Sequence, residues 1–139
     1  MIQAYTKNTT VAENATIPLN NVSTIKGCTT TTSGNSAISL NQKGVYMVSV
    51  DAVATAGIVG VIQFQLSQNG TLLPQAITAE TATDITGQHA LSFVTLITVE
   101  ENACRCDCST PDTIINFVNN GVQATYNNFN VVITKKDAK

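Results

Sequence analysis

The chain has 139 residues, of which only 12% are charged, and its formal net charge is −2. The length fits a single domain, and the charged fraction is about half of the value typical of soluble domains. With seven Lys and Arg in all, the chain lacks the basic patch that nucleic-acid binding requires. A surface with so little charge suits a protein packed among other subunits, and it equally suits a plain β-sandwich.

The N-terminal segment predicts no export signal. Residues Met1 to Lys7 contain no apolar signal core, and no stretch approaches the roughly 20 apolar residues of a membrane span. We therefore expect synthesis in the cytoplasm, no membrane insertion, and release by lysis or assembly. Residues up to about Pro18 are polar and irregular, which predicts an N-terminal arm over residues 1–18 and a folded domain over residues 19–139.

The first half of the folded domain is patterned as strands. The Thr-rich stretch from Cys28 to Thr32 favours extended backbone and predicts an edge strand. Residues 45–54 and 60–68 alternate apolar and polar side chains, the period-2 pattern of a strand with one buried face. The second of these strands runs into Asn69-Gly70, the dipeptide that most readily forms a tight hairpin turn. A short strand over residues 76–83 is expected next.

The strand expected over residues 89–99 is the longest in the second half, and it is apolar on both faces. Leu91, Phe93, Ile97 and Val99 occupy one face, whereas Val94 and Leu96 occupy the other. An antiparallel strand in a monomeric sandwich usually has one face in water. The second apolar face therefore needs a cover, for which a partner subunit is the simplest candidate and a long loop of the same chain is the alternative.

Two further strands complete the pattern. Residues 113–119 and residues 126–134 alternate in the same way, and Asn119-Asn120-Gly121 supplies a turn between them. No segment has the period of an amphipathic helix. Short strands at this spacing predict an all-β fold, an antiparallel sandwich or jelly roll.

The order of these elements resembles the trimeric jelly roll of the tumour necrosis factor and complement globular-head superfamily. The resemblance rests on the strand Gly44–Val50, the strand and turn Phe64–Gly70, and the later strands Leu91–Val99 and Phe129–Thr134, within about residues 36–135. It implies two sheets of ten or so strands in all and a homotrimer about a threefold axis. The axis residues that it implies are Val94 and Leu96, with Tyr46 or Tyr126.

The sequence departs from the animal members of that superfamily. It has no collagen-like Gly-X-Y stalk and no signal peptide, and the loop after Val99 runs through Glu100 and Glu101 into cysteines. Small jelly rolls without a stalk resemble those on bacteriophage virions and on bacterial spore surfaces. Virion proteins leave the cell by lysis, so they need no signal peptide.

The cysteines form the most unusual local motif. Cys104, Cys106 and Cys108 are spaced two apart, so on an extended chain their thiols would line one face. With Cys28 as the fourth cysteine they could hold a zinc ion, although structural zinc sites usually separate paired cysteines by more residues. A disulfide, a cross-link between subunits, or reduced thiols without a special role are the alternatives.

No constellation predicts catalysis. His89 is the sole histidine and opens a strand, where a structural role is the simpler interpretation. Glu80 and Asp84 lie four residues apart and could in principle form a glycosidase-like pair or a calcium site, but no aromatic platform flanks them. We assign no catalytic residue and no resident cofactor, with a metal at the cysteines left open.

The sequence therefore predicts a non-enzymatic structural protein on the surface of a bacteriophage virion, either a capsid decoration or a head-fibre trimer. Its expected partners are two further copies of itself and a virion shell protein, which residues 1–18 would contact. The alternatives are a recognition head that binds a host glycan or protein through loops such as residues 81–88 and 102–112, and a spore-surface subunit.

Overall fold

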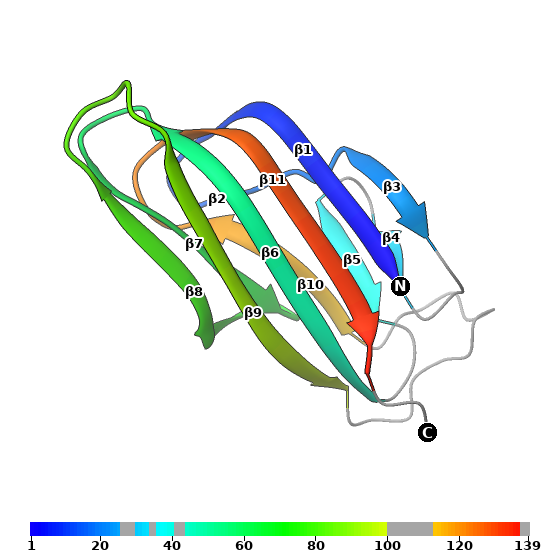
Figure 1. The fold of residues 1–139 in the computed structure, drawn as a ribbon. Helices are drawn as coiled ribbons and strands as arrows, with labels where there is room; N and C mark the ends of the chain where they lie inside the picture. Colours follow the sequence, from blue (N-terminus) through cyan, green and yellow to red (C-terminus); the bar gives the residue numbers. More distant parts are fainter. Residues whose placement is uncertain (26–29, 34–35, 41–43, 100–112, 137–139) are drawn as a thin grey trace.

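The computed structural model describes residues 1–25, 30–33, 36–40, 44–99 and 113–136. These residues form two antiparallel β-sheets that pack face to face (Figure 1). The first, sheet A, contains, in spatial order, β3 (Asn21–Ile25), β1 (Ile2–Val11), β11 (Ala124–Lys135), β6 (Gly44–Ala56) and β9 (His89–Val99).

The second sheet, sheet B, lies against the inner face of sheet A. Its strands, in spatial order, are β4 (Thr30–Ser33), β5 (Ala37–Leu40), β10 (Thr113–Asn119), β7 (Gly60–Gln68) and β8 (Thr71–Ala82), and the two-residue β2 (Ala15–Thr16) pairs with β10. The chain passes repeatedly from one sheet to the other, so that strands distant in the sequence become neighbours. This antiparallel jelly roll confirms the predicted fold class.

The strongly alternating segments fold as predicted. The strands expected over residues 60–68, 89–99 and 113–119 have these bounds in the structure. At the predicted hairpin, Asn69 and Gly70 have φ angles of 52° and 87°. Two successive positive φ angles are typical of the two-residue turn that matches the twist of a hairpin.

The predicted N-terminal arm is wrong. Residues 2–11 form β1, which lies inside sheet A and pairs with β11 from Ile2↔Ile133 to Val11↔Ala124. The side chains of Ile2 and Ala4 are fully buried in the core. This end of the chain alternates apolar and polar residues only briefly, and it forms a strand because β11 is available to pair with it. Residues 1–18 are therefore part of the domain.

Strand β8 is also longer than predicted. It begins at Thr71 and includes Pro74, whereas the sequence pattern placed a strand only from residue 76. Proline cannot donate a hydrogen bond to a neighbouring strand, so within sheets it is confined largely to edges. Since β8 is an edge strand of sheet B, it tolerates Pro74.

Five aromatic rings occupy the centre of the sandwich. The ring centroid of Phe129 lies 5.0 Å from that of Phe64 and 5.4 Å from that of Phe117. Tyr126 stands edge-on to Phe129 at 5.6 Å, and Phe93 lies 5.8 Å from Phe64. Edge-to-face pairs at these separations are favourable beyond the area that they bury, so this aromatic cluster joins the two sheets.

A β-bulge allows Tyr126 to join that cluster. The pairing of β11 with β6 shifts register between Tyr126 and Asn128. Tyr126 and Phe129 are three residues apart and would point to opposite faces of a regular strand. Because the bulge adds one residue between them, both side chains point to the same face of sheet A, and both are fully buried.

We expect Phe129→Ala to destabilise the domain strongly, because it removes a ring that contacts three others. The free energy of unfolding should fall by about 3–5 kcal/mol, as measured by chemical denaturation. Asn130→Ala on the opposite face of the same strand is the control, because it loses only a hydrogen bond from Gln3 and should cost about 1 kcal/mol or less. Equal losses in the two variants would contradict the central role of the cluster.

Candidate functional site

Two of the predicted interface residues lie on the surface. Val94 and Leu96 are on the outer face of β9, and their exposed fractions are 64% and 57%. The strand is at the edge of sheet A (Figure 1). Its inner face, which carries Leu91, Ile97 and Val99, is buried in the core. The sequence thus correctly assigned the two faces of this strand, and the described part of the chain provides no cover for the outer one.

The apolar surface extends from β9 into the neighbouring strands. Leu96 pairs with Met47 of β6, and Val94 pairs with Ser49, which in turn pairs with Val132 of β11. Directly paired residues on antiparallel strands share a face, and Met47 and Val132 are half-buried. We call the apolar residues Met47, Val94, Leu96 and Val132 the β9 band.

The two predicted tyrosines are not surface residues, and this part of the interface prediction is corrected. Tyr46 and Tyr126 are fully buried within the single chain, because the parity of their strands directs them toward sheet B. The hydroxyl of Tyr126 donates a 2.8 Å hydrogen bond to Oδ1 of Asn119, and burial raises the pKa of the phenol above its ordinary value. Both tyrosines belong to the core, not to a contact between subunits.

The cysteine motif lies outside the described residues, as do all four cysteines, Cys28, Cys104, Cys106 and Cys108. Their metal and disulfide alternatives stay predictions. Within the described ranges, no three His, Asp or Glu side chains are placed to share a metal ion. The same ranges contain no helix long and apolar enough to span a membrane.

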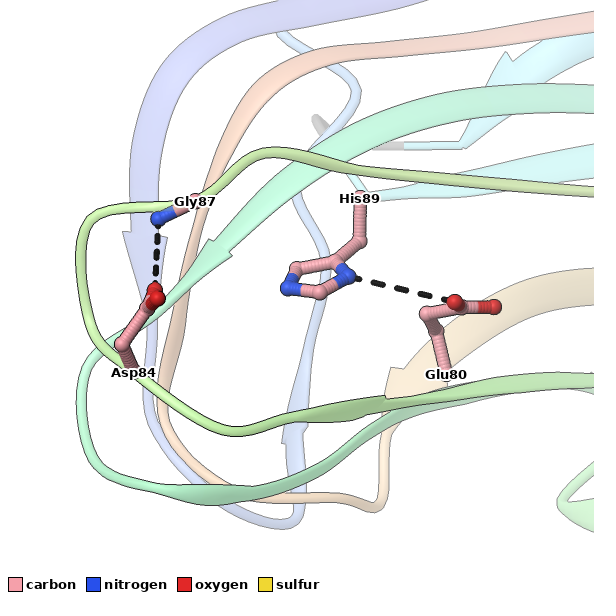
Figure 2. A network of polar contacts seen from close by, with 4 residues as sticks. All are labelled: Glu80, Asp84, Gly87 and His89. Atoms are coloured by element: carbon pink, nitrogen blue, oxygen red, sulfur yellow. Dashed lines mark hydrogen bonds and ion pairs between the residues drawn. The ribbon is translucent and has the colours of Figure 1, made fainter.

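The single histidine bridges the two sheets at their open edge. Nδ1 of His89 in β9 lies 4.0 Å from Oε1 of Glu80 in β8 (Figure 2). The two strands belong to different sheets but are consecutive in the chain. Glu80 is thus a strand residue, and it contacts His89 instead of forming an acid pair with Asp84.

Asp84 organises the loop that joins those two strands. Its Oδ1 atom accepts a hydrogen bond from the backbone N–H of Gly87 at 2.8 Å (Figure 2). It accepts a second from the backbone N–H of Thr86 at 3.1 Å. These bonds stabilise the carboxylate, and the one from Gly87 contributes most to lowering the pKa of Asp84 below 3.8. The carboxylate of Asp84 thus stabilises the turn of its own loop.

Among the described residues, four connections meet at one end of the sandwich, opposite the end where Ile2 pairs with Ile133. They are residues 12–14, 57–59, 83–88 and 120–123, and together we call them the loop end. Three aliphatic side chains of the loop end are more than half exposed, namely Ile58, Val59 and Ile85. The sequence predicted residues 81–88 as a recognition loop but did not connect them with Ile58 and Val59, although two apolar residues between glycines were a visible signal. The other predicted recognition loop, residues 102–112, lies outside the described residues.

The buried amide of Asn119 holds the base of the loop end together. Its Nδ2 atom donates to the carbonyl oxygens of Val11, Ala12 and Val122, each at 3.1 Å. Its Oδ1 atom accepts from the hydroxyl of Tyr126, as described above. A fully satisfied buried network rigidifies the segments that it connects, so the loop end has a fixed base.

Comparisons with solved structures show which known fold this chain shares. No protein-family model and no curated protein matches the sequence. Among solved structures, the Eiger TNF of S. frugiperda superposes with a TM-score of 0.71 at 12% identity, over 99% of this chain and 94% of that one. The chain has the TNF-like jelly-roll fold.

Two more solved structures share this fold. Murine APRIL has a TM-score of 0.65 at 8% identity, over 96% of this chain and 98% of that one. The PRD1 vertex protein P5 has a TM-score of 0.60 at 15% identity, over 98% of this chain and 96% of that one. Identities this low show the fold alone. The shared jelly-roll fold confirms the resemblance that the sequence predicted.

We expect Asp84→Ala to loosen the 83–88 loop and Asp84→Asn to preserve it. Alanine removes the oxygen that accepts from Thr86 and Gly87, whereas asparagine keeps an oxygen in that place. Amide exchange measured by NMR should be faster at these two residues in the alanine variant only. Unchanged exchange in Asp84→Ala would contradict the role of the carboxylate.

The stability of the 83–88 loop should fall at acidic pH. Hydrogen bonding lowers the folded-state pKa of Asp84 below 3.8. The stabilisation that the ionised carboxylate gives the loop is therefore fully present above the unfolded-state pKa, and it is lost as the pH falls through the folded-state pKa. A carboxyl titration midpoint at or above 3.8 would contradict the hydrogen-bonded arrangement.

Proposed function

We propose that the chain is a non-enzymatic structural protein of a bacteriophage virion, a capsid decoration or head-fibre subunit that assembles as a homotrimer. The observation that carries this proposal is the β9 band, an exposed apolar surface on a jelly-roll edge. The likeness to the PRD1 vertex protein P5 supports the virion setting. The low charge of the chain is compatible with close packing among other subunits.

The band has the properties of a subunit contact. Val94 and Leu96 stand on a regular strand, with Met47 beside them, so their positions are fixed before association. Burying one Val or Leu side chain contributes about 1.5–3 kcal/mol, and three copies of the contact would form in a closed ring. Burial of these exposed side chains would therefore favour association at each contact.

A threefold ring requires two different surfaces on each subunit, since its contacts are heterologous. The β9 band is one of them. The neighbouring edge strand β8 exposes the aliphatic side chains of Leu72 and Ile77 and is our candidate for the other. Pairing a sheet face with a sheet edge would also cover the open edge that β8 and β9 form, and so protect it from nonspecific strand addition.

Contact with a virion shell protein would need a surface of the folded domain. Residues 2–11 are paired in sheet A, so extending them toward a shell protein would break the pairs with both β11 and β3. We therefore propose that the trimer attaches to the virion as a folded unit and is displayed on the virion surface.

We expect the double variant Val94→Ser and Leu96→Ser to abolish trimers. Each substitution removes apolar area from the contact while leaving the core-facing side of β9 unchanged. Analytical ultracentrifugation should show the variant as a monomer at concentrations where the unmodified chain is trimeric. The double variant Ile58→Ser and Ile85→Ser removes similar area at the loop end and should stay trimeric; the reverse pattern would refute the assigned interface.

The virion setting is tested by locating the chain. Particles purified on a density gradient from cultures that carry its gene should contain it, as measured by mass spectrometry, and antibodies should label it on the outside of intact particles. Recovery only in the soluble fraction, or in the coat of purified spores, would contradict a virion role without bearing on trimer formation.

A further inference from the structure

The loop end gathers exposed apolar side chains at one extremity of the molecule. The β6–β7 connection carries Ile58 and Val59, and the β8–β9 connection carries Ile85. The two connections lie side by side at the upper left of Figure 1, and the same two loops are neighbours at the left of Figure 2. Side chains from separate parts of the sequence thus contribute to one apolar surface.

The fold of the domain does not account for these side chains. Just inside them, Ile62 of β7 and Leu91 of β9 already fill the core. Turns usually carry small or polar residues because their side chains face water. Apolar residues grouped at an exposed tip are a mark of an interaction surface, and none of the three is needed to close either connection.

The backbone beneath Ile58 and Val59 is fixed by the neighbouring turn. The N–H of Gly57 donates to the carbonyl of Gln123 at 2.7 Å, and the N–H of Val122 donates to the carbonyl of Val61 at 2.9 Å. A side chain at Gly57 would lie 3.0 Å from that same Gln123 oxygen. The connection is therefore held close against residues 120–123.

The backbone beneath Ile85 is fixed by its own loop. Asp84 accepts hydrogen bonds from the N–H groups of Thr86 and Gly87, which places Ile85 within a closed turn. The His89–Glu80 contact holds the strands at the base of this loop. Groups fixed before binding lose less conformational entropy when a partner orders them, so the loop end is preorganised for a contact.

The charge of the loop end indicates the charge of its partner. Its four connections contain the acidic residues Glu13 and Asp84 and no Lys or Arg. Lys135 and Lys136, at the end of β11, lie at the other extremity of the sandwich. Complementary charge favours a cationic partner, and the same acids repel anionic surfaces such as acidic lipid.

We propose that the loop end is a docking surface for a protein partner that presents an apolar pocket bordered by lysine or arginine side chains. The pocket would receive Ile58, Val59 and Ile85, and the basic border would face Glu13 and Asp84. This proposal is independent of the trimer, because the β9 band and the loop end share no residue. It gives the recognition alternative a specific surface and a specific class of partner.

The probe for this proposal is a synthetic amphipathic helical peptide of leucine and lysine, compared with a leucine and glutamate peptide of the same pattern. We expect the lysine peptide to bind saturably and to shift the NMR amide signals of residues 57–61 and 83–88. The glutamate peptide should bind at least tenfold more weakly. Equal binding of both peptides, or shifts confined to other surfaces, would overturn the proposal.

Variants of the full-length chain separate the apolar from the charged contribution. Ile85→Ser should weaken binding of the lysine peptide about tenfold, and Ile58→Ser with Val59→Ser should weaken it further. Asp84→Asn keeps the loop's acceptor oxygen and should reduce both the affinity and its salt dependence. Val22→Ser, which removes an exposed aliphatic group on β3, should change nothing; a loss equal to that of Ile85→Ser would overturn the assignment.

Vesicles distinguish a protein partner from a membrane. Vesicles of phosphatidylcholine with phosphatidylserine should not retain the chain, because both acids of the loop end oppose them. Retention that disappears in the Ile58→Ser and Val59→Ser variant would overturn the protein assignment and make the loop end a lipid-binding tip. The oligomeric state, measured in the same samples, shows whether any loss of binding comes from loss of the trimer.

Discussion

The aromatic cluster between the sheets determines which side of each strand faces inward. Once Phe64, Phe117 and Phe129 meet at the centre, the two-residue period of every neighbouring strand is fixed. On β9 this directs Leu91 and Ile97 into the core and leaves the outer face to solvent. The packing of the core thus decides which positions face outward. Because aliphatic residues occupy some of these positions, the outside of sheet A carries an apolar surface.

Two surfaces follow from this arrangement, and they have different physical characters. The β9 band is an apolar face on paired strands without charged members, which suits contact with an identical subunit. The loop end carries two acids and three exposed aliphatic side chains, which suits a different and cationic partner. A trimer built through the first would display three copies of the second. Assembly and recognition would then be separate properties of one small domain.

Periodicity predicted the fold well because a strand with one buried face alternates apolar and polar residues, as residues 60–68 and 113–119 do. It failed where long-range pairing decides the structure. Residues 2–11 become a strand only beside β11, and Tyr126 turns inward only because the register shifts at Asn127. The loop end was predicted only in part, through residues 81–88, because Ile58 and Ile85 are brought together by topology and not by spacing along the chain.

We propose above all that the chain associates through an exposed sheet face. The most direct test is the mass of the unmodified chain in solution, measured by sedimentation equilibrium over a range of concentrations. One chain has a mass of 14.6 kDa, and we expect a single species of three times that mass, with dissociation only on dilution. A species of 14.6 kDa at every concentration would contradict association through this face.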